Sequence, residues 1–117
     1  MSYDFSGQTV LVTGGAHGFG RAIAGSFATR GATVFVCDVV EHELKKTLEI
    51  IGDACYGTIV DVTDRFAVDA WVQSALSQTG RVDVLVNNAG GVLGQVGRPL
   101  EEVTIQDWEA VVAVNQT

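Results

Sequence analysis

A glycine-rich segment that joins an apolar strand pattern to a helical pattern constrains the fold of this chain more than any other feature. Thr13–Gly20 reads T-G-G-A-H-G-F-G, follows the apolar run Thr9–Val12 and opens a helical pattern that extends to about Arg30. A strand that turns directly into a helix needs residues without Cβ, because the backbone turns tightly and approaches a ligand closely. The free N–H groups and positive dipole end of the helix suit a pyrophosphate. The segment is therefore predicted to bind a dinucleotide.

The spacing of these glycines differs from the usual dinucleotide-binding pattern. That pattern is G-x-G-x-x-G, whereas Gly14, Gly18 and Gly20 give G-x-x-x-G-x-G, with Gly15 in addition. Glycine also marks ordinary turns, so a purely structural strand–helix turn is the alternative. Placement favours binding, because Asp38 ends the next apolar run, where an acceptor for ribose hydroxyls is expected.

Charge and hydropathy exclude several classes of partner. The chain has 117 residues, enough for one domain, and 14 acidic against 7 basic residues give it a net charge of −7. Nucleic acids and anionic membranes bind basic surfaces, so neither is expected as a partner. No apolar run approaches the roughly 18 residues of a membrane span. The N-terminus lacks the basic start of a signal peptide, so we expect a cytoplasmic protein.

The two cysteines, Cys37 and Cys55, fall within predicted strands and form no C-x-x-C pattern. They are interpreted as small buried hydrophobic residues in a reducing compartment, with a disulfide or a redox role as the alternative. No metal-ligand set is predicted. The composition is 47% hydrophobic with a mean hydropathy of +0.27, which predicts a buried core.

Strand and helix patterns alternate along the chain. Strands are predicted at Thr9–Thr13, Thr33–Cys37, Cys55–Val60 (interrupted by Gly57) and Val82–Val86. Helices are predicted from the glycine-rich segment to Arg30, over Glu41–Ile51, from Thr63 or Asp64 to Gly80, and from near Thr104. This alternation indicates a parallel sheet with right-handed crossovers and helices on both faces. The predicted fold class is α/β: one doubly wound, Rossmann-like three-layer α/β/α domain over residues 1–117, with the first four strands in the order 3-2-1-4.

Polar residues gather where the predicted strands end. Thr13 ends the first strand, Asp38 follows the second, Asp61 follows the third, and Asn87 and Asn88 follow the fourth. Ligands of such sheets bind at the carboxyl ends of the strands. The sequence therefore predicts one binding site along this edge.

Five groups of residues, in this order and spacing, carry a resemblance to a known family. They are the T-G-x-x-x-G-x-G loop (Thr13, Gly14, Gly18, Gly20), Asp38, Asp61-Val62, the N-N-A-G motif at 87–90, and Asn115 in the last helix. Together they resemble the short-chain dehydrogenase/reductase family over nearly the whole chain. Members use a nicotinamide dinucleotide to oxidise alcohols or reduce carbonyls, so the resemblance implies such an activity.

The resemblance implies that six residues of the loop bind the cofactor: Thr13, Gly14, His17, Gly18, Phe19 and Gly20. The glycines at 14, 18 and 20 would let the backbone approach the pyrophosphate. Asp38 would bind both hydroxyls of the adenosine ribose, which favours NAD over NADP because a carboxylate repels a 2′-phosphate. His17 occupies a position where NADP-using members often carry a basic residue, but a histidine is mostly neutral at pH 7.

The same resemblance places the rest of the cofactor. Asp61 would meet the adenine amino group and Val62 its ring, although Asp61 could instead help to cap the next helix. Asn88, Ala89 and Gly90 would line the path to the nicotinamide ribose. Asn87 is predicted to brace the strand ends by hydrogen bonds.

Asn115 lies on an inward stripe of the last predicted helix, at helical spacing from Trp108, Val111 and Val112. A buried amide needs partners. In the family this asparagine orders a water in a proton relay, so Asn115 is the one catalytic residue that the resemblance implies here. The alternative is an asparagine exposed at a frayed helix end.

The catalytic serine and Tyr-x-x-x-Lys pair of the family have no complete counterpart in this chain. Neither Tyr3 nor Tyr56 is followed by lysine four residues later. We therefore expect the N-terminal, cofactor-binding part of a longer enzyme, truncated on the C-terminal side and inactive as it stands. That enzyme would interconvert a small-molecule alcohol and a carbonyl with NAD.

Two other functions stay open from the sequence. The chain could bind NAD(H) without chemistry, or it could complete its sheet by pairing its fourth strand with a partner chain. The resemblance implies a homo-oligomer, a tetramer in most relatives. The substrate is not identified by any motif.

Overall fold

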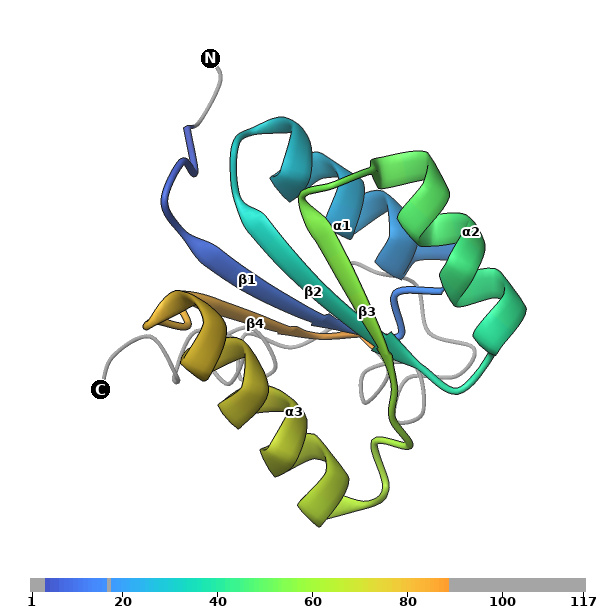
Figure 1. The fold of residues 1–117 in the computed structure, drawn as a ribbon. Helices are drawn as coiled ribbons and strands as arrows, with labels where there is room; N and C mark the ends of the chain where they lie inside the picture. The colour runs from blue at the N-terminus through green and yellow to red at the C-terminus, as the bar shows by residue number, and fades with distance from the viewer. Residues whose placement is uncertain (1–3, 17, 89–117) are drawn as a thin grey trace, which may run out of the picture.

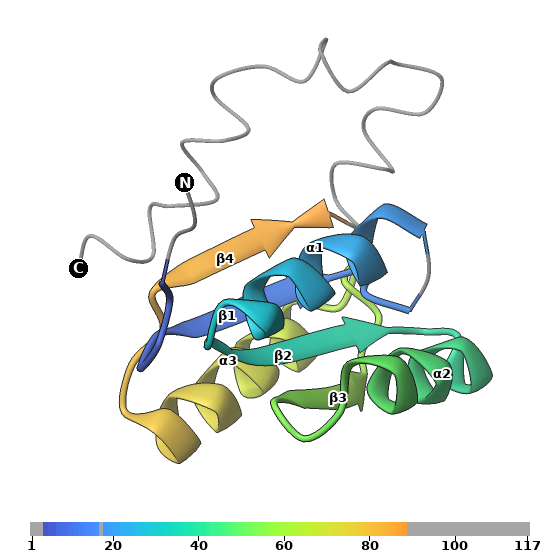
Figure 2. The ribbon, with the colours of Figure 1, turned by 90° about the horizontal axis from the view of Figure 1, so that it is seen from above.

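The structure is a computed structural model that describes residues 4–16 and 18–88. Its strands are β1 (Thr9–Thr13), β2 (Thr33–Asp38), β3 (Cys55–Ile59) and β4 (Val84–Asn87), and its helices are α1 (Gly18–Thr29), α2 (Glu41–Ile51) and α3 (Arg65–Thr79). The strands form one parallel sheet in the order β3-β2-β1-β4. Helices α1 and α2 cover one face and α3 covers the other (Figures 1 and 2). The predicted α/β class, strand order and layering are confirmed.

Alternating side chains of the central strands build a core on each face of the sheet. Val10, Val12, Val34 and Val36 pack on the side of α1 and α2, whereas Leu11, Phe35 and Cys37 pack on the side of α3 with Trp71 and Ala75. Strand β1 is buried along its whole length, as a strand covered on both faces should be. The core therefore holds the carboxyl ends of β1 and β2 rigidly side by side.

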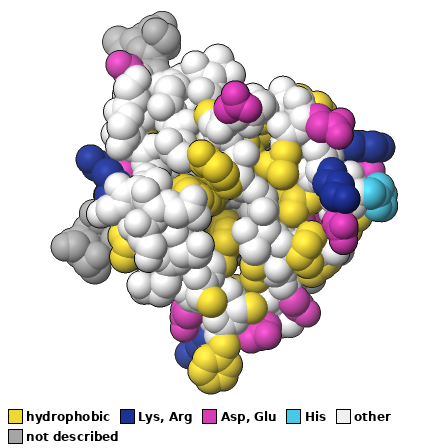
Figure 3. Space-filling model, viewed as in Figure 1, with side chains coloured by type: hydrophobic (Ala, Val, Ile, Leu, Met, Phe, Trp, Pro, Cys, Tyr) yellow, Lys and Arg dark blue, Asp and Glu magenta, His cyan; other side chains and the backbone are white. Residues whose placement is uncertain are grey.

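Strand β3 forms one edge of the sheet, and its exposed side chains mark that edge. Tyr56 is 48% exposed and Ile59 is 49% exposed. Figure 3 shows apolar side chains at the surface over the middle of the molecule, where β3 faces the viewer in Figure 1. Gly57 does not interrupt the strand, contrary to the prediction. A Cβ at Gly57 would lie 3.0 Å from Leu48 Cδ1 and 3.1 Å from Leu44 Cγ, so this glycine lets α2 pack against β3.

The ends of α2 and α3 follow local signals in the sequence. The Asp64 carboxylate accepts the N–H of Ala67 at 3.2 Å, which caps α3, and Gly80 ends it with φ of 80°. Gly52 ends α2 with φ of 95°, and its N–H donates to Leu48 O at 2.8 Å. The predicted helix near Thr104 lies outside the described residues. Over the described part of the chain, no helix has the length and apolar composition needed to cross a bilayer.

Strand β4 begins at Val84, two residues later than predicted, and Asp83 just before it contacts β1 through its backbone N–H and its side chain. The Asp83 carboxylate accepts the N–H of Thr9 at 2.7 Å, which a strand carbonyl would otherwise accept. The first ladder pair is therefore Val10 with Val84.

Candidate functional site

The loop from β1 into α1 runs along the carboxyl edge of the sheet. Gly14 and Gly18 have φ of 67° and 59°, a region that glycine adopts without strain. Gly15 donates its N–H to Cys37 O at 3.1 Å, and a Cβ there would lie 2.6 Å from Val36 Cβ. The loop therefore lies directly against the end of β2.

Two glycines of the loop differ in what surrounds them. A Cβ at Gly20 would lie 2.0 Å from Gly14 O and 2.9 Å from Asn88 Nδ2, so Gly20 allows α1 to pack onto the loop. A Cβ at Gly18 would meet no described atom within 4 Å, and Gly18 is exposed. The first turn of α1 thus has open backbone at Gly18, which fits a phosphate approaching the helix N-terminus.

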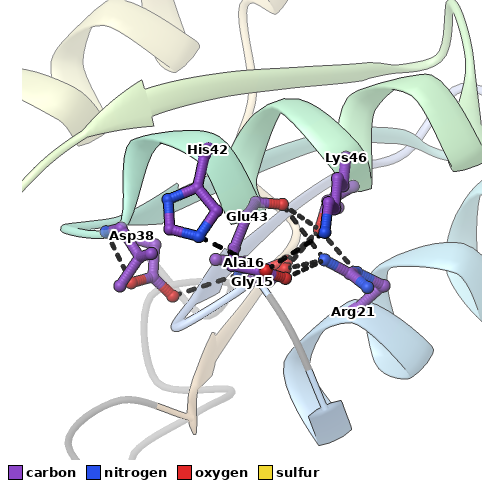
Figure 4. Close-up of polar contacts among 9 residues, drawn as sticks. Gly15, Ala16, Arg21, Asp38, His42, Glu43 and Lys46 are labelled. Carbon is purple, nitrogen blue, oxygen red and sulfur yellow. Dashed lines mark hydrogen bonds and ion pairs between the residues drawn. The ribbon is translucent and has the colours of Figure 1, made fainter.

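Asp38 ends β2 beside this loop. Its Oδ2 accepts the N–H of Ala16 at 3.1 Å, and its Oδ1 accepts the N–H groups of Val39 at 2.7 Å and Val40 at 3.2 Å. Figure 4 shows the Asp38 carboxylate next to Ala16. A carboxylate accepts about four hydrogen bonds, so Oδ2 retains the capacity to accept one more donor, such as a hydroxyl group.

Hydrogen bonds join the ends of β1 and β4 on the other side of the loop. The Thr13 hydroxyl lies 3.1 Å from Asn87 Oδ1 and 3.5 Å from Val86 O, and the Asn88 amide donates to Gly14 O at 3.2 Å. The prediction that Asn87 braces the strand ends is confirmed. Asn88 braces the loop as well, which the sequence did not indicate.

Asp61 holds the turn before α3. Its Oδ1 accepts the N–H of Thr63 at 2.9 Å and the Thr63 hydroxyl at 2.6 Å, and these bonds lower the pKa of Asp61. Asp64, not Asp61, caps the helix. Val62 packs against the core on the α3 side of the sheet. Asp61 therefore has a structural role at this turn.

Three polar residues behind the loop were missed by the sequence analysis. The Thr47 hydroxyl on α2 lies 2.9 Å from Gly15 O and 2.8 Å from Ala16 O. Arg21 on α1 donates to Thr47 Oγ1 at 2.8 Å, to Ala16 O, and to Glu43 Oε2 at 3.1 Å. Figure 4 shows the Arg21 and Glu43 side chains close to Gly15 and Ala16. These residues tie the loop to both helices on one face of the sheet.

Two signals could have identified Thr47 and Arg21. Thr47 shares the apolar stripe of Leu44, Leu48 and Ile51, where a hydroxyl needs a partner. Arg21 lies in the first turn of α1, where a cation opposes the helix dipole and needs an acid nearby.

Both cysteines are free, buried thiols. Burial and, to a smaller extent, the charge of Asp38 raise the pKa of Cys37 to about 12, despite a hydrogen bond from the Gly14 backbone that lowers it. Burial alone raises the pKa of Cys55 to about 11. Both side chains therefore stay protonated and pack as hydrophobic residues. Among the described residues, no three or more His, Cys, Asp or Glu side chains are grouped to hold a metal ion.

Several predicted site residues fall outside this geometry. His17, Ala89, Gly90 and Asn115 lie outside the described residues. Phe19 lies in the first turn of α1, and 52% of its surface is exposed. The structure thus brings together Thr13, Gly14, Gly18, Gly20, Asp38 and Asn88 at one edge of the sheet, with Asp61 and Val62 following the neighbouring strand.

Comparisons with known proteins agree with this arrangement. The family model for short chain dehydrogenases matches residues 8–117. A CLA biosynthesis dehydrogenase/reductase of Lactiplantibacillus plantarum is 39% identical over 96% of this chain and 39% of its own length. A D-threitol dehydrogenase of Mycolicibacterium smegmatis is 38% identical over 98% of this chain and 45% of its own length.

A solved structure shares the fold. The crystal structure of a 3-ketoacyl-(acyl-carrier-protein) reductase from Brucella melitensis, complexed with NADH, has a TM-score of 0.70 and 35% identity. The match covers 96% of this chain and 46% of that chain. The chain thus spans less than half of the length of these relatives. On its sequence and its fold alike, it belongs to the short-chain dehydrogenase family.

Proposed function

We propose that this chain is the cofactor-binding part of an NAD-dependent oxidoreductase that interconverts an alcohol and a carbonyl by hydride transfer. The observation that carries the proposal is the position of Asp38. Its Oδ2 lies 3.1 Å from Ala16 N, so an acceptor for ribose hydroxyls stands next to the loop that would hold the pyrophosphate. Open backbone at Gly18 and the close contact of Gly20 with Gly14 fit the same ligand.

Each part of the cofactor has proposed contacts. Gly14 and Gly18, with Thr13, His17, Phe19 and Gly20 in the same loop, would hold the pyrophosphate. Asp38 would accept a hydroxyl of the adenosine ribose through Oδ2, and Asp61 and Val62 would contact the adenine. Asn88, Ala89 and Gly90 would line the nicotinamide ribose.

The proposal favours NAD over NADP on electrostatic grounds. A 2′-phosphate beside the Asp38 carboxylate would be repelled, and the residues that follow, Val39 and Val40, offer no cation. The Brucella melitensis relative was solved with NADH, which supports the same choice.

The bound nicotinamide would supply the hydride chemistry, and the residues of this chain would bind and orient it. We propose Asn115 as a member of a proton relay, by the family resemblance. The proposed substrate is a small-molecule alcohol or ketone, and we propose a cytoplasmic homo-oligomer.

The test is a pair of titrations on the full-length protein. NADH and NADPH binding are measured by fluorescence for the unaltered protein, for Asp38→Ala and for the control Asp53→Ala, which removes an equal charge at an exposed position. We expect Asp38→Ala to weaken NADH binding about tenfold or more, as loss of hydrogen bonds to a charged group predicts. The control should bind like the unaltered protein. An unaltered protein that prefers NADPH, or binds neither, would contradict the proposal.

Turnover separates this function from the alternative of a binding module. A full-length protein that binds NADH and reduces carbonyl compounds supports an enzyme. Binding without turnover against a broad panel of ketones would instead indicate a protein that binds NAD(H) without catalysis.

A further inference from the structure

We propose that Thr47 and Arg21 are positioning residues that set the orientation of the Gly15–Ala16 peptide and thereby the ribose-binding oxygen of Asp38. The inference rests on the proposed cofactor function. Neither residue is among those proposed to contact the cofactor. Both act through the backbone of the loop.

One peptide unit links the two sites. The carbonyl of Gly15 and the N–H of Ala16 belong to the same planar group, in which they point in opposite directions. The Thr47 hydroxyl lies 2.9 Å from that carbonyl oxygen, and Asp38 Oδ2 accepts that N–H at 3.1 Å. Thr47 and Asp38 therefore hold the two ends of one peptide. A rotation of this peptide that breaks one bond also breaks the other.

The environment of Thr47 directs its hydroxyl toward the loop. Thr47 is fully buried, and its oxygen accepts a hydrogen bond from Arg21 Nε at 2.8 Å. Its single hydrogen then has three carbonyl acceptors: those of Gly15, Ala16 and Glu43. The bond to Glu43 O, one turn earlier in the helix, is the longest at 3.3 Å. The two loop carbonyls at 2.9 and 2.8 Å are therefore its better partners.

Arg21 is held in place by Glu43. The Arg21 guanidinium donates to Glu43 Oε2 at 3.1 Å and to Glu43 O at 3.1 Å, and only about a quarter of each side chain is exposed. The hydrogen bond from Arg21 lowers the pKa of Glu43, burial opposes this, and Lys46 adds to it. The other carboxylate oxygen faces Lys46 and His42, at 3.4 and 3.5 Å. Arg21 thus bridges α1, the loop and α2.

The decisive experiment is a double-mutant cycle on the full-length protein, with ADP-ribose binding measured by calorimetry. We expect Thr47→Val to weaken ADP-ribose binding about tenfold. Thr47→Ser keeps the hydroxyl and should bind within about twofold of the unaltered protein. In the Asp38→Ala background, Thr47→Val should have little further effect on ADP-ribose affinity. Thr47 is proposed to act through Asp38, and the free-energy effects of coupled substitutions do not add.

A matched control separates this effect from a general loss of stability. Thr79 on α3 also donates its hydroxyl to backbone carbonyls, Ala75 O at 3.0 Å and Arg81 O at 2.7 Å, on the opposite face of the sheet. Thr79→Val should lower the thermal unfolding midpoint but leave ADP-ribose binding unchanged. Should Thr47→Val not fold, Arg21→Met takes its place in the same cycle, because it removes the N–H donors that orient the hydroxyl while keeping an unbranched side chain.

Three results of these binding experiments would overturn the inference. Additive effects of Thr47→Val and Asp38→Ala would overturn the inference, as would an unchanged affinity in Thr47→Val or an equal loss in Thr79→Val. If the unaltered protein binds neither NADH nor ADP-ribose, the proposed function itself fails.

Discussion

Asp83 pairs with Thr9 through both its backbone and its side chain. The Asp83 N–H donates to Thr9 O at 2.9 Å, and the Asp83 carboxylate accepts the Thr9 N–H at 2.7 Å. The Arg81 side chain binds both carboxylate oxygens, with Nε at 2.9 and 2.8 Å. This cluster starts the β1–β4 pairing at the edge of the sheet opposite the candidate site.

We expect Asp83→Ala to destabilise the protein by about 1–3 kcal/mol, because the buried Thr9 N–H loses its acceptor. Asp83 is 5% exposed, so water does not replace it easily. Urea unfolding of the full-length protein at pH 7 measures the change. The control is Asp53→Ala, an exposed position that should change little. An equal loss in both variants would contradict the role of Asp83.

The pKa of the Asp83 carboxylate leads to a prediction of how the stability of the protein depends on pH. Burial raises the pKa of Asp83, but hydrogen bonds from Arg81 and Thr9 and the Arg81 charge outweigh it and leave the pKa below its usual value. A lowered pKa contributes stability above the unfolded value of about 4 and loses it as pH falls through the folded value. The stability difference between the unaltered protein and Asp83→Asn should therefore be largest above pH about 4 and shrink below it. A difference that grows toward acid would contradict this.

The capping of α3 by Asp64 leads to a prediction about stability. Its carboxylate accepts the Ala67 N–H at 3.2 Å at the start of α3, so Asp64→Ala should cost about 1 kcal/mol in the free energy of unfolding. Asp69→Ala removes the same charge from an exposed position within the helix and should be neutral or slightly stabilising. Equal costs for the two variants would indicate a charge effect instead of a cap.

The cysteines should be unreactive in the folded protein. The pKa of Cys37 is raised to about 12 and that of Cys55 to about 11, so neither forms a thiolate at pH 8. A thiol reagent such as DTNB should label these two residues only after unfolding in guanidinium. Rapid labelling of either in the native protein would show that it is accessible. Labelled sites are assigned by peptide mass spectrometry.

The sequence predicted those parts of the fold that depend on local patterns. Helix Glu41–Ile51 has the predicted bounds because its apolar stripe and the glycine that follows it lie close together along the chain. Asp64 and Gly80 likewise mark the ends of α3 through contacts within one turn. The parallel sheet followed from the alternation of strands and helices, and the strand order followed from the Rossmann-like fold predicted on that basis.

Contacts between distant segments escaped prediction. Thr47 lies 32 positions from Gly15 along the chain, and their hydrogen bond depends on how closely α2 packs beside the loop. The Asp83 side chain, just before β4, accepts a hydrogen bond from Thr9, 74 positions away. Gly57 looked like a break in a strand, and only the packing of α2 shows what it accommodates. The sequence shows that a buried polar side chain such as Thr47 or Asp83 needs a hydrogen-bond partner, but it does not show which distant residue is that partner.

Alanine substitutions at three glycines of α1 distinguish two effects: a steric clash with the loop, and the cost of a left-handed backbone conformation. A Cβ at Gly20 would lie 2.0 Å from Gly14 O, a backbone atom that cannot move without shifting the loop, so Gly20→Ala should lose both stability and NADH binding. Gly18→Ala meets no described atom but forces a left-handed φ of 59°, at a cost of about 1–2 kcal/mol. Gly25→Ala is the control. Its Cβ would lie 3.9 Å from Ile51 Cγ1, an ordinary contact, and alanine favours a helix interior by up to about 1 kcal/mol.

The expected order of thermal midpoints is Gly25→Ala at or above the unaltered protein, then Gly18→Ala, then Gly20→Ala. NADH titration should show full affinity for Gly25→Ala and the weakest binding for Gly20→Ala, because only that change displaces the backbone of the loop. If Gly20→Ala kept the affinity of the unaltered protein, the contact between α1 and Gly14 would have no part in holding the cofactor. The pyrophosphate would then have to bind away from this loop.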